Sequence, residues 1–288
     1  MRHAGILCLI AGVLVQGGCA SVGESGRSRL VAPQGIGAAY SEMELQAQLF
    51  LAADANCTAG SCDNRPAFRS QVSRLGAKLS QAAQREFPQL RRRIHDFHFQ
   101  VLAKSDIGVL SSAMGSVAVL DGLRRLETDE PTLAFILARE MGHVIAEHHE
   151  ENSATSLLVS VAVTLALPVA NMLRGAAAAA PATAGGVTTT AATTAASMVG
   201  GRALRSVYRP DQLQEADVIG MRLTLQAGYK AEEVIDGLTG LAPRLKDEGW
   251  TGELLATKAY LDFALAGPPP PDLSETSVAA IDLSTADR

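Results

Sequence analysis

The chain has 288 residues, a net charge of −5 and 19% charged residues. This length is enough for one domain with a full core plus tails. No stretch gathers basic residues as a nucleic-acid-binding surface does, and we interpret the run Arg91 to Arg93 as a solvated helix end. We therefore expect no nucleic-acid partner.

The first residues read as a targeting segment. A short basic n-region with Arg2 precedes an apolar core over residues 4–15, which is too short to span a membrane as a mature helix. Gly-Gly-Cys-Ala-Ser follows at 17–21 and resembles a bacterial lipoprotein cleavage site, although Gln16 stands where an apolar residue is usual. We predict a signal peptide over 1–18 and lipidation of Cys19, with ordinary secretion as the alternative.

Two further cysteines fit a compartment outside the cytoplasm. Cys57 and Cys62 bracket a four-residue turn that a disulfide could close in an oxidising periplasm. A zinc half-site is the weaker alternative, since no second Cys/His pair follows at knuckle spacing. Residues 19–37 are rich in Gly and Ser and read as the linker to a lipid anchor.

Periodicity predicts a mixed fold. Helical spacing covers 40–53 and 66–87. Alternation over 96–101, with Phe97, Phe99 and Val101 on one side, indicates a half-buried strand. A loop over 108–116 leads to a second strand at 117–120.

The next helix carries the most informative residues. Thr128 to Pro131 reads as a helix start, and an apolar stripe follows from Leu133 to His149. Glu140 lies within this stripe, between Arg139 and His143. A carboxylate in an apolar stripe needs a partner, so this helix is a candidate site.

The rest of the chain shows three patterns. The apolar run 157–173 is too short for a membrane span and contains Pro168, so a buried or site-covering helix is expected. Residues 174–201 are a low-complexity loop and 212–227 a helix. The segment 246–288 is predicted to be an extension whose tail, from Gly267, is disordered.

Residues 139–143 lie in the frame of the helical zinc-protease motif H-E-x-x-H, with arginine at the first histidine. That motif places two imidazoles at i and i+4 on one face, and its glutamate activates zinc-bound water. A guanidinium stays protonated and has no free lone pair, so Arg139 cannot ligate a metal.

On these residues, together with Glu-Ala-Asp at 215–217 and Gly220, the chain resembles the zinc metallopeptidase family that includes the CAAX-prenyl proteases and the periplasmic β-barrel-assembly-enhancing protease. The resemblance covers about 94–238. It implies a domain over 38–245 with an α+β, mostly helical, gluzincin-like fold. A small sheet with a substrate-binding edge strand would lie beside the active-site helix.

The resemblance also implies roles for single residues. Arg139 stands at the first zinc ligand, Glu140 at the general base and His143 at the second ligand. The third ligand falls on Leu213, and Asp217 is the group that would orient the first histidine. Two of the three zinc ligands are therefore replaced, and His143 alone cannot hold catalytic zinc.

The replacements suggest a partner for the arginine. We predict a salt bridge between Arg139 and Asp217. A metal site rebuilt from Glu140, His143 and Glu147 on one helix face is the competing possibility, in which zinc would be the cofactor; otherwise we expect none.

The remaining candidates have simpler explanations. His148 and His149 are expected to form a solvated helix end and His98 to be exposed on its strand. No serine lies in a nucleophile-elbow motif.

The sequence thus predicts an outer-membrane lipoprotein facing the periplasm, with a peptidase-like domain that no longer hydrolyses. It would bind extended or misfolded chains by strand addition in envelope quality control, with the outer-membrane assembly machinery as a candidate partner. The alternatives are an active metalloendopeptidase with a rebuilt metal site and a structural scaffold lipoprotein.

Overall fold

The computed structural model describes residues 20–21, 28–29, 34–55, 65–155, 209–247 and 249–266. The predicted signal peptide, the cysteines at 19, 57 and 62, the segments 157–173 and 174–201 and the tail from 267 lie outside these residues. Among the described helices, none is long and apolar enough to cross a membrane.

The described residues form an α+β fold that is mostly helical, as predicted. In chain order, the elements are β1 (Ala20–Ser21), β2 (Ser28–Arg29), α2 (Gln34–Leu51), α3 (Arg65–Glu86), η1 (Pro88–Arg92), β3 (His98–Leu102), β4 (Val109–Ser111), β5 (Ser116–Leu120), η2 (Asp121–Leu126), α4 (Glu130–Ile145), α7 (Pro210–Gln226), α8 (Ala231–Leu241), η3 (Ala242–Arg244) and α9 (Gly249–Ala266).

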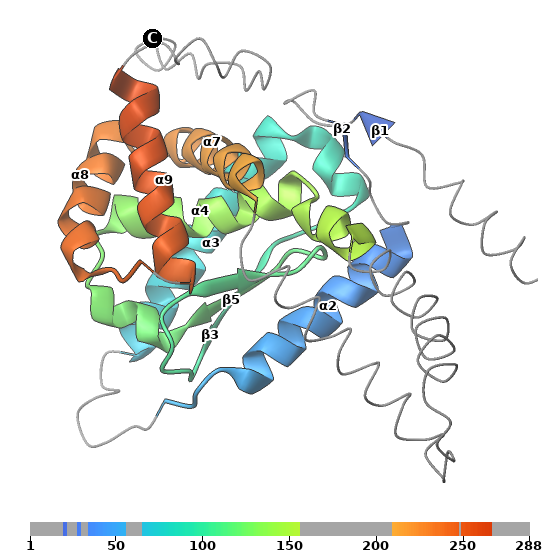
Figure 1. Cartoon of the computed structure of the whole chain (residues 1–288), viewed down its shortest axis with the longest axis horizontal. Helices are drawn as coiled ribbons and strands as arrows, with labels where there is room; N and C mark the ends of the chain where they lie inside the picture. The colour runs from blue at the N-terminus through green and yellow to red at the C-terminus, as the bar shows by residue number, and fades with distance from the viewer. Residues whose placement is uncertain are drawn as a thin grey trace, which may run out of the picture.

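A small sheet lies at the centre, in the order β3-β5-β4 (Figure 1). β5 pairs in parallel with β3 and antiparallel with β4. The strands predicted at 96–101 and 117–120 are found as β3 and β5. β4 was missed, because its three residues fall within the segment predicted as a loop.

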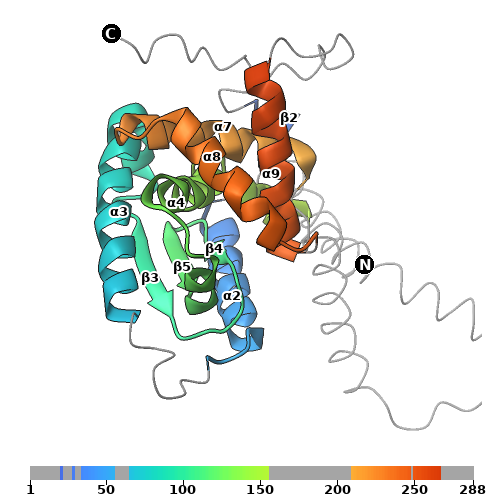
Figure 2. The same cartoon turned by 90° about the vertical axis from the view of Figure 1, so that its left-hand side faces the viewer.

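Helix α4 lies between the sheet and the layer of α7 and α8, with α3 beside β3 and α2 beside β4 (Figure 2). Every residue of α4 from Thr132 to Val144 is buried, which is why its apolar stripe is so continuous. The side chain of Asp129 caps the helix by accepting a hydrogen bond from the backbone N–H of Thr132.

Helix α4 ends earlier than predicted. It stops at Ile145, and Glu147 adopts a left-handed conformation with φ of +60° before a new helical turn begins at His148. Arg93 donates hydrogen bonds to the carbonyl oxygens of Val144 and Ile145 and to Glu150. Arg93 therefore satisfies a helix C-terminus, whereas Arg91 and Arg92 are exposed as expected.

Helix α9 lies in the segment 246–288, which is predicted to be an extension of the domain. It packs against α7 and α8 and buries Leu254, Thr257 and Leu261. These positions recur at three and four residues, a helical period that was not recognised in the sequence.

Candidate active site and its degenerate zinc motif

Two glycines bring α4 and α7 unusually close together. A Cβ atom at Gly142 would lie 2.5 Å from the backbone oxygen of Ala216, and one at Gly220 would lie 2.8 Å from the Cα of Arg139. No side chain fits at either point, so the helices meet backbone to backbone. This contact places Arg139 of α4 directly beside Asp217 of α7.

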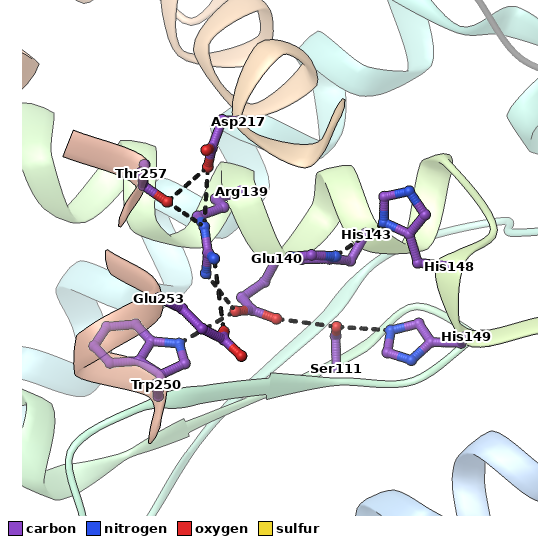
Figure 3. A network of polar contacts seen from close by, with 10 residues as sticks. All are labelled: Ser111, Arg139, Glu140, His143, His148, His149, Asp217, Trp250, Glu253 and Thr257. Carbon is purple, nitrogen blue, oxygen red and sulfur yellow. Dashed lines mark hydrogen bonds and ion pairs between the residues drawn. The ribbon is translucent and has the colours of Figure 1, made fainter. Parts of the chain in front are cut away.

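The predicted salt bridge is present and fully buried (Figure 3). The Nε atom of Arg139 donates to Asp217 Oδ1 at 3.0 Å and to Thr257 Oγ1 at 3.1 Å. Its two terminal nitrogens lie 3.5 Å from Glu140 Oε1 and 3.6 Å from Glu253 Oε2. The side chains of Arg139 and Asp217 are each 1% exposed. One cation thus lies among three carboxyl groups.

We call Arg139 and the side chains around it the cage, and α9 supplies three of its residues, none of which the sequence predicts. Thr257 donates to Asp217 Oδ1 at 2.9 Å, and the indole of Trp250 donates to Glu140 Oε1 at 3.3 Å. Glu253 lies between them on the same helix. The sequence does hold a signal for α9: Trp250 is the only tryptophan in the chain, and apolar positions at helical spacing follow it.

Burial dominates the acid–base properties of the cage. It raises the pKa of Glu140 to about 7, an effect that Arg139 opposes and Glu253 reinforces. It also raises the pKa of Asp217 to about 6, again against the effect of Arg139. Burial disfavours the charged guanidinium, but Asp217, Glu140 and Glu253 raise the pKa of Arg139 above its ordinary value. Arg139 therefore stays cationic.

His143 lies one turn further along α4 in a different setting. Its Nδ1 is 2.9 Å from Nδ1 of His148, whose Nε2 is 3.2 Å from Glu215 Oε2. Burial lowers the pKa of His143 well below its ordinary value, and the neighbouring imidazoles and Arg139 lower it further. His143 is therefore neutral at pH 7.

The prediction of a solvated end at His148 and His149 is wrong. His148 is 0% and His149 is 8% exposed, because the turn at Glu147 folds the chain back toward α4. His149 Nε2 lies 3.0 Å from Ser111 Oγ, which donates to Glu140 Oε2 at 3.2 Å. His98 is exposed, as expected.

The residues at the motif positions do not fit a catalytic zinc ion. Arg139 is a buried cation, and Leu213, at the third ligand position, is a buried apolar side chain. Only His143 offers a ligand atom, whereas catalytic zinc takes three protein ligands.

The proposed replacement ligands do not come together either. Within the described residues, no group of three or more His, Cys, Asp or Glu side chains could hold a metal ion. The sequence predicts that Glu147 shares a helix face with Glu140 and His143. It does not, because α4 ends at Ile145. Its carboxylate instead lies 3.8 Å from Arg93.

The two edges of the sheet differ in access. In β4, next to the motif, Val109 is 1% and Ser111 8% exposed. The backbone N–H of Ala113, just beyond β4, donates to Ser41 of α2 at 2.8 Å. At the opposite edge, His98 and Gln100 of β3 are exposed beside a hollow of about 680 Å³.

The fold and the motif together define a metallopeptidase-like domain. The sequence profile of peptidase family M48 matches residues 69–271. The chain therefore belongs to peptidase family M48, a family of zinc metallopeptidases, and the match includes α9 with Trp250, Glu253 and Thr257. No curated protein matches the chain.

Proposed function

We propose that this chain is a non-hydrolytic member of the peptidase family, anchored in the envelope as a lipoprotein, that binds extended or misfolded polypeptides. The buried ion pair between Arg139 and Asp217 carries the proposal. A fixed cation lies where the first zinc ligand would be, and the group that would orient that ligand is its counter-ion. Without a bound zinc ion, the chain cannot activate a water molecule as zinc peptidases do.

The polypeptide would bind at a sheet edge by strand addition. The backbone groups of alternate residues on an edge strand point away from the sheet and can pair with an extended chain. Val109 and Ser111 of β4 are buried and the strand is flanked by α2, whereas His98 and Gln100 of β3 are exposed beside the hollow. We therefore place the first contact at β3, and binding at β4 would require α2 to move.

The hollow beside β3 also favours a particular partner. It is lined by Gln84, Arg85, Arg91, Asp96 and His98, among others. Arg91 donates to Gln84, which in turn donates to the carbonyl oxygens of Ile94 and His95. Two guanidiniums against one carboxylate favour extended segments that carry an acidic side chain.

Zinc content is the first test. Purified mature chain is expected to hold zinc near background by elemental mass spectrometry after mild dialysis. The double variant Arg139→His with Leu213→Glu restores the family's ligand types and should take up zinc at close to one ion per chain. Stoichiometric zinc in the unaltered chain would contradict the proposal and favour an active enzyme with a rebuilt site.

Peptide hydrolysis is the second test. The unaltered chain should leave an unfolded casein substrate intact over hours, and Glu140→Gln should behave identically. Cleavage that Glu140→Gln abolishes would revive the active-enzyme alternative.

The binding site is tested by photo-crosslinking. A benzoylphenylalanine at His98 or Gln100 should crosslink an extended acidic peptide, while one at Leu110 in β4 or at the exposed Glu232 of α8 should not. Crosslinks from Leu110 alone would move the site to β4. Crosslinks from no position would leave the scaffold alternative.

Anchoring is tested separately. A labelled fatty acid should be incorporated into the full chain and should be lost in Cys19→Ala, which should also move the protein from the membrane to the soluble fraction. A protein that remains soluble and unlabelled with Cys19 intact would refute the lipoprotein assignment.

A further inference from the structure

Helix α2 has an outward face of an unusual kind. Four of the six large apolar side chains exposed among the described residues belong to it, with exposed fractions of 53% for Ile36, 52% for Met43, 86% for Phe50 and 55% for Leu51. Ile36, Met43 and Phe50 are seven residues apart and thus share one face. A surface helix normally turns its apolar face inward and its charges outward, and α2 does not.

The two glutamates of α2 do not break this face. Glu42 and Glu44 are only partly exposed, and each accepts a hydrogen bond from a glutamine four residues later. The inner face buries Gly37, Ser41 and Leu45. Among the residues whose burial is described, every exposed residue of α2 is therefore uncharged.

A fifth apolar side chain lies close by. Met114 is 58% exposed and follows Ala113, whose N–H donates to Ser41 of α2. Exposed apolar surface of this extent on one side of a soluble domain marks a contact with another phase or molecule.

A second copy of the chain is a poor occupant. α2 contains no lysine or arginine between Gln34 and Leu51. In a symmetric helix pair, each copy of α2 would bring two glutamates and no basic side chain of its own, and like charges across such a pair are unfavourable.

The position of α2 in the chain indicates a better occupant. Ala20, which follows Cys19 in the sequence, pairs with Arg29, and Arg29 is five positions before Gln34 at the start of α2. Five extended residues plus one strand spacing span at most about 25 Å. An anchor at Cys19 would therefore hold α2 at the membrane surface, where effective concentration favours even weak insertion.

We propose that the outward face of α2 rests on the zwitterionic lipid surface to which Cys19 is anchored. This inference depends on the proposed lipidation of Cys19. The face inserts by its apolar side chains alone, since it has no cation to attract anionic headgroups. In both views α2 lies on the side of the sheet away from α7 and α8, so these helices would face away from the membrane (Figures 1 and 2).

The test uses the lipidated full chain in phosphatidylcholine vesicles with brominated acyl chains. Trp250 is the only native tryptophan and gives the background emission. Phe50→Trp places a fluorescent reporter on the outward face of α2. Phe263→Trp is the matched control, since Phe263 is 41% exposed toward the C-terminal end of α9, far from α2. The added emission of Phe50→Trp should fall by about half relative to unbrominated vesicles, and that of Phe263→Trp should not change.

The possible failures can be told apart. If the chain floats with the vesicles and both reporters are quenched equally or not at all, the contact of α2 with lipid is refuted while anchoring stands. If the chain does not float, the anchor is absent and both proposals fail. If the soluble mature chain is a dimer by light scattering and Phe50→Glu makes it a monomer, α2 binds a second copy instead.

Discussion

Arg139 and His143 lie one turn apart on α4 and are both buried, yet their surroundings differ in kind. Arg139 is surrounded by the carboxyl groups of Asp217, Glu140 and Glu253. His143 is in contact with a second imidazole, and burial keeps it neutral. Arg139 is the centre of a charge cluster to which three helices contribute. His143 keeps a ligand atom, and among the described residues no group that could hold a metal ion forms around it.

The difference shows how the motif can change without loss of the fold. A buried arginine needs a buried acid, and Asp217 supplies it from the neighbouring helix α7. Helix α9 completes the cage with Thr257 and Glu253. Gly142 and Gly220 let α4 and α7 meet backbone to backbone, which brings Arg139 directly beside Asp217.

Breaking the ion pair should have the largest effect. Asp217→Ala leaves the guanidinium of Arg139 without its closest carboxylate and should lower the free energy of unfolding by about 3–5 kcal/mol. Urea unfolding at pH 7.5 measures this loss. Asp217→Asn keeps an acceptor for Arg139 and Thr257 and should cost less. An unchanged midpoint in Asp217→Ala would show that the pair contributes nothing to stability.

The close contact of α4 and α7 gives the second prediction. Gly142→Ala places a Cβ atom 2.5 Å from the backbone oxygen of Ala216, so the helices must separate, at a cost of about 1–3 kcal/mol. Gly240→Ala in α8 is the matched control. A Cβ there meets nothing within 4 Å, so the better helix former should stabilise the chain by up to about 1 kcal/mol. Equal effects at the two positions would mean that the spacing of α4 and α7 is not critical.

The sequence predicted much of this region, and each miss has a physical reason. The apolar stripe of α4, the strands β3 and β5, and the pairing of Arg139 with Asp217 follow from periodicity and charge. β4 is too short to show alternation. The early end of α4 depends on a left-handed Glu147, which no glycine or proline signals.

The contribution of α9 could be foreseen only in part. Its buried positions have helical spacing, but the fact that Trp250 and Glu253 face Glu140 and Arg139 is a product of tertiary packing. Local sequence can predict a helix, and it cannot say which distant charge that helix will meet.

The smallest expected effect is a pH dependence at the acidic side of the cage. Burial raises the pKa of Glu140 to about 7 in the folded chain, above its ordinary value of 4.5. The folded state thus binds a proton that the unfolded state has released, so this stabilisation is present below pH 4.5 and is lost as the pH rises through about 7. From pH 6 to pH 8 the loss amounts to about 1 kcal/mol.

His143 changes stability in the opposite direction. Its lowered pKa means that the unfolded state takes up a proton first, so stability falls as the pH drops below about 6.5. Both effects overlap between pH 6 and pH 8 with the titration of Asp217, whose pKa is raised to about 6, and only a variant can separate the contribution of Glu140. Glu140→Gln removes the carboxyl titration and retains the histidine.

Urea unfolding of the two chains at pH 6 and pH 8 therefore isolates Glu140. The unaltered chain should lose about 1 kcal/mol more than Glu140→Gln over this range. Glu130→Gln is the control, because the pKa of Glu130 is lowered to about 2 by its hydrogen bonds with Arg74 and Tyr229, and this group stays ionised throughout. Its pH dependence should parallel that of the unaltered chain. If the curve of Glu140→Gln also parallels that of the unaltered chain, Glu140 is already ionised at pH 6. It would then be a second counter-ion of Arg139, beside Asp217.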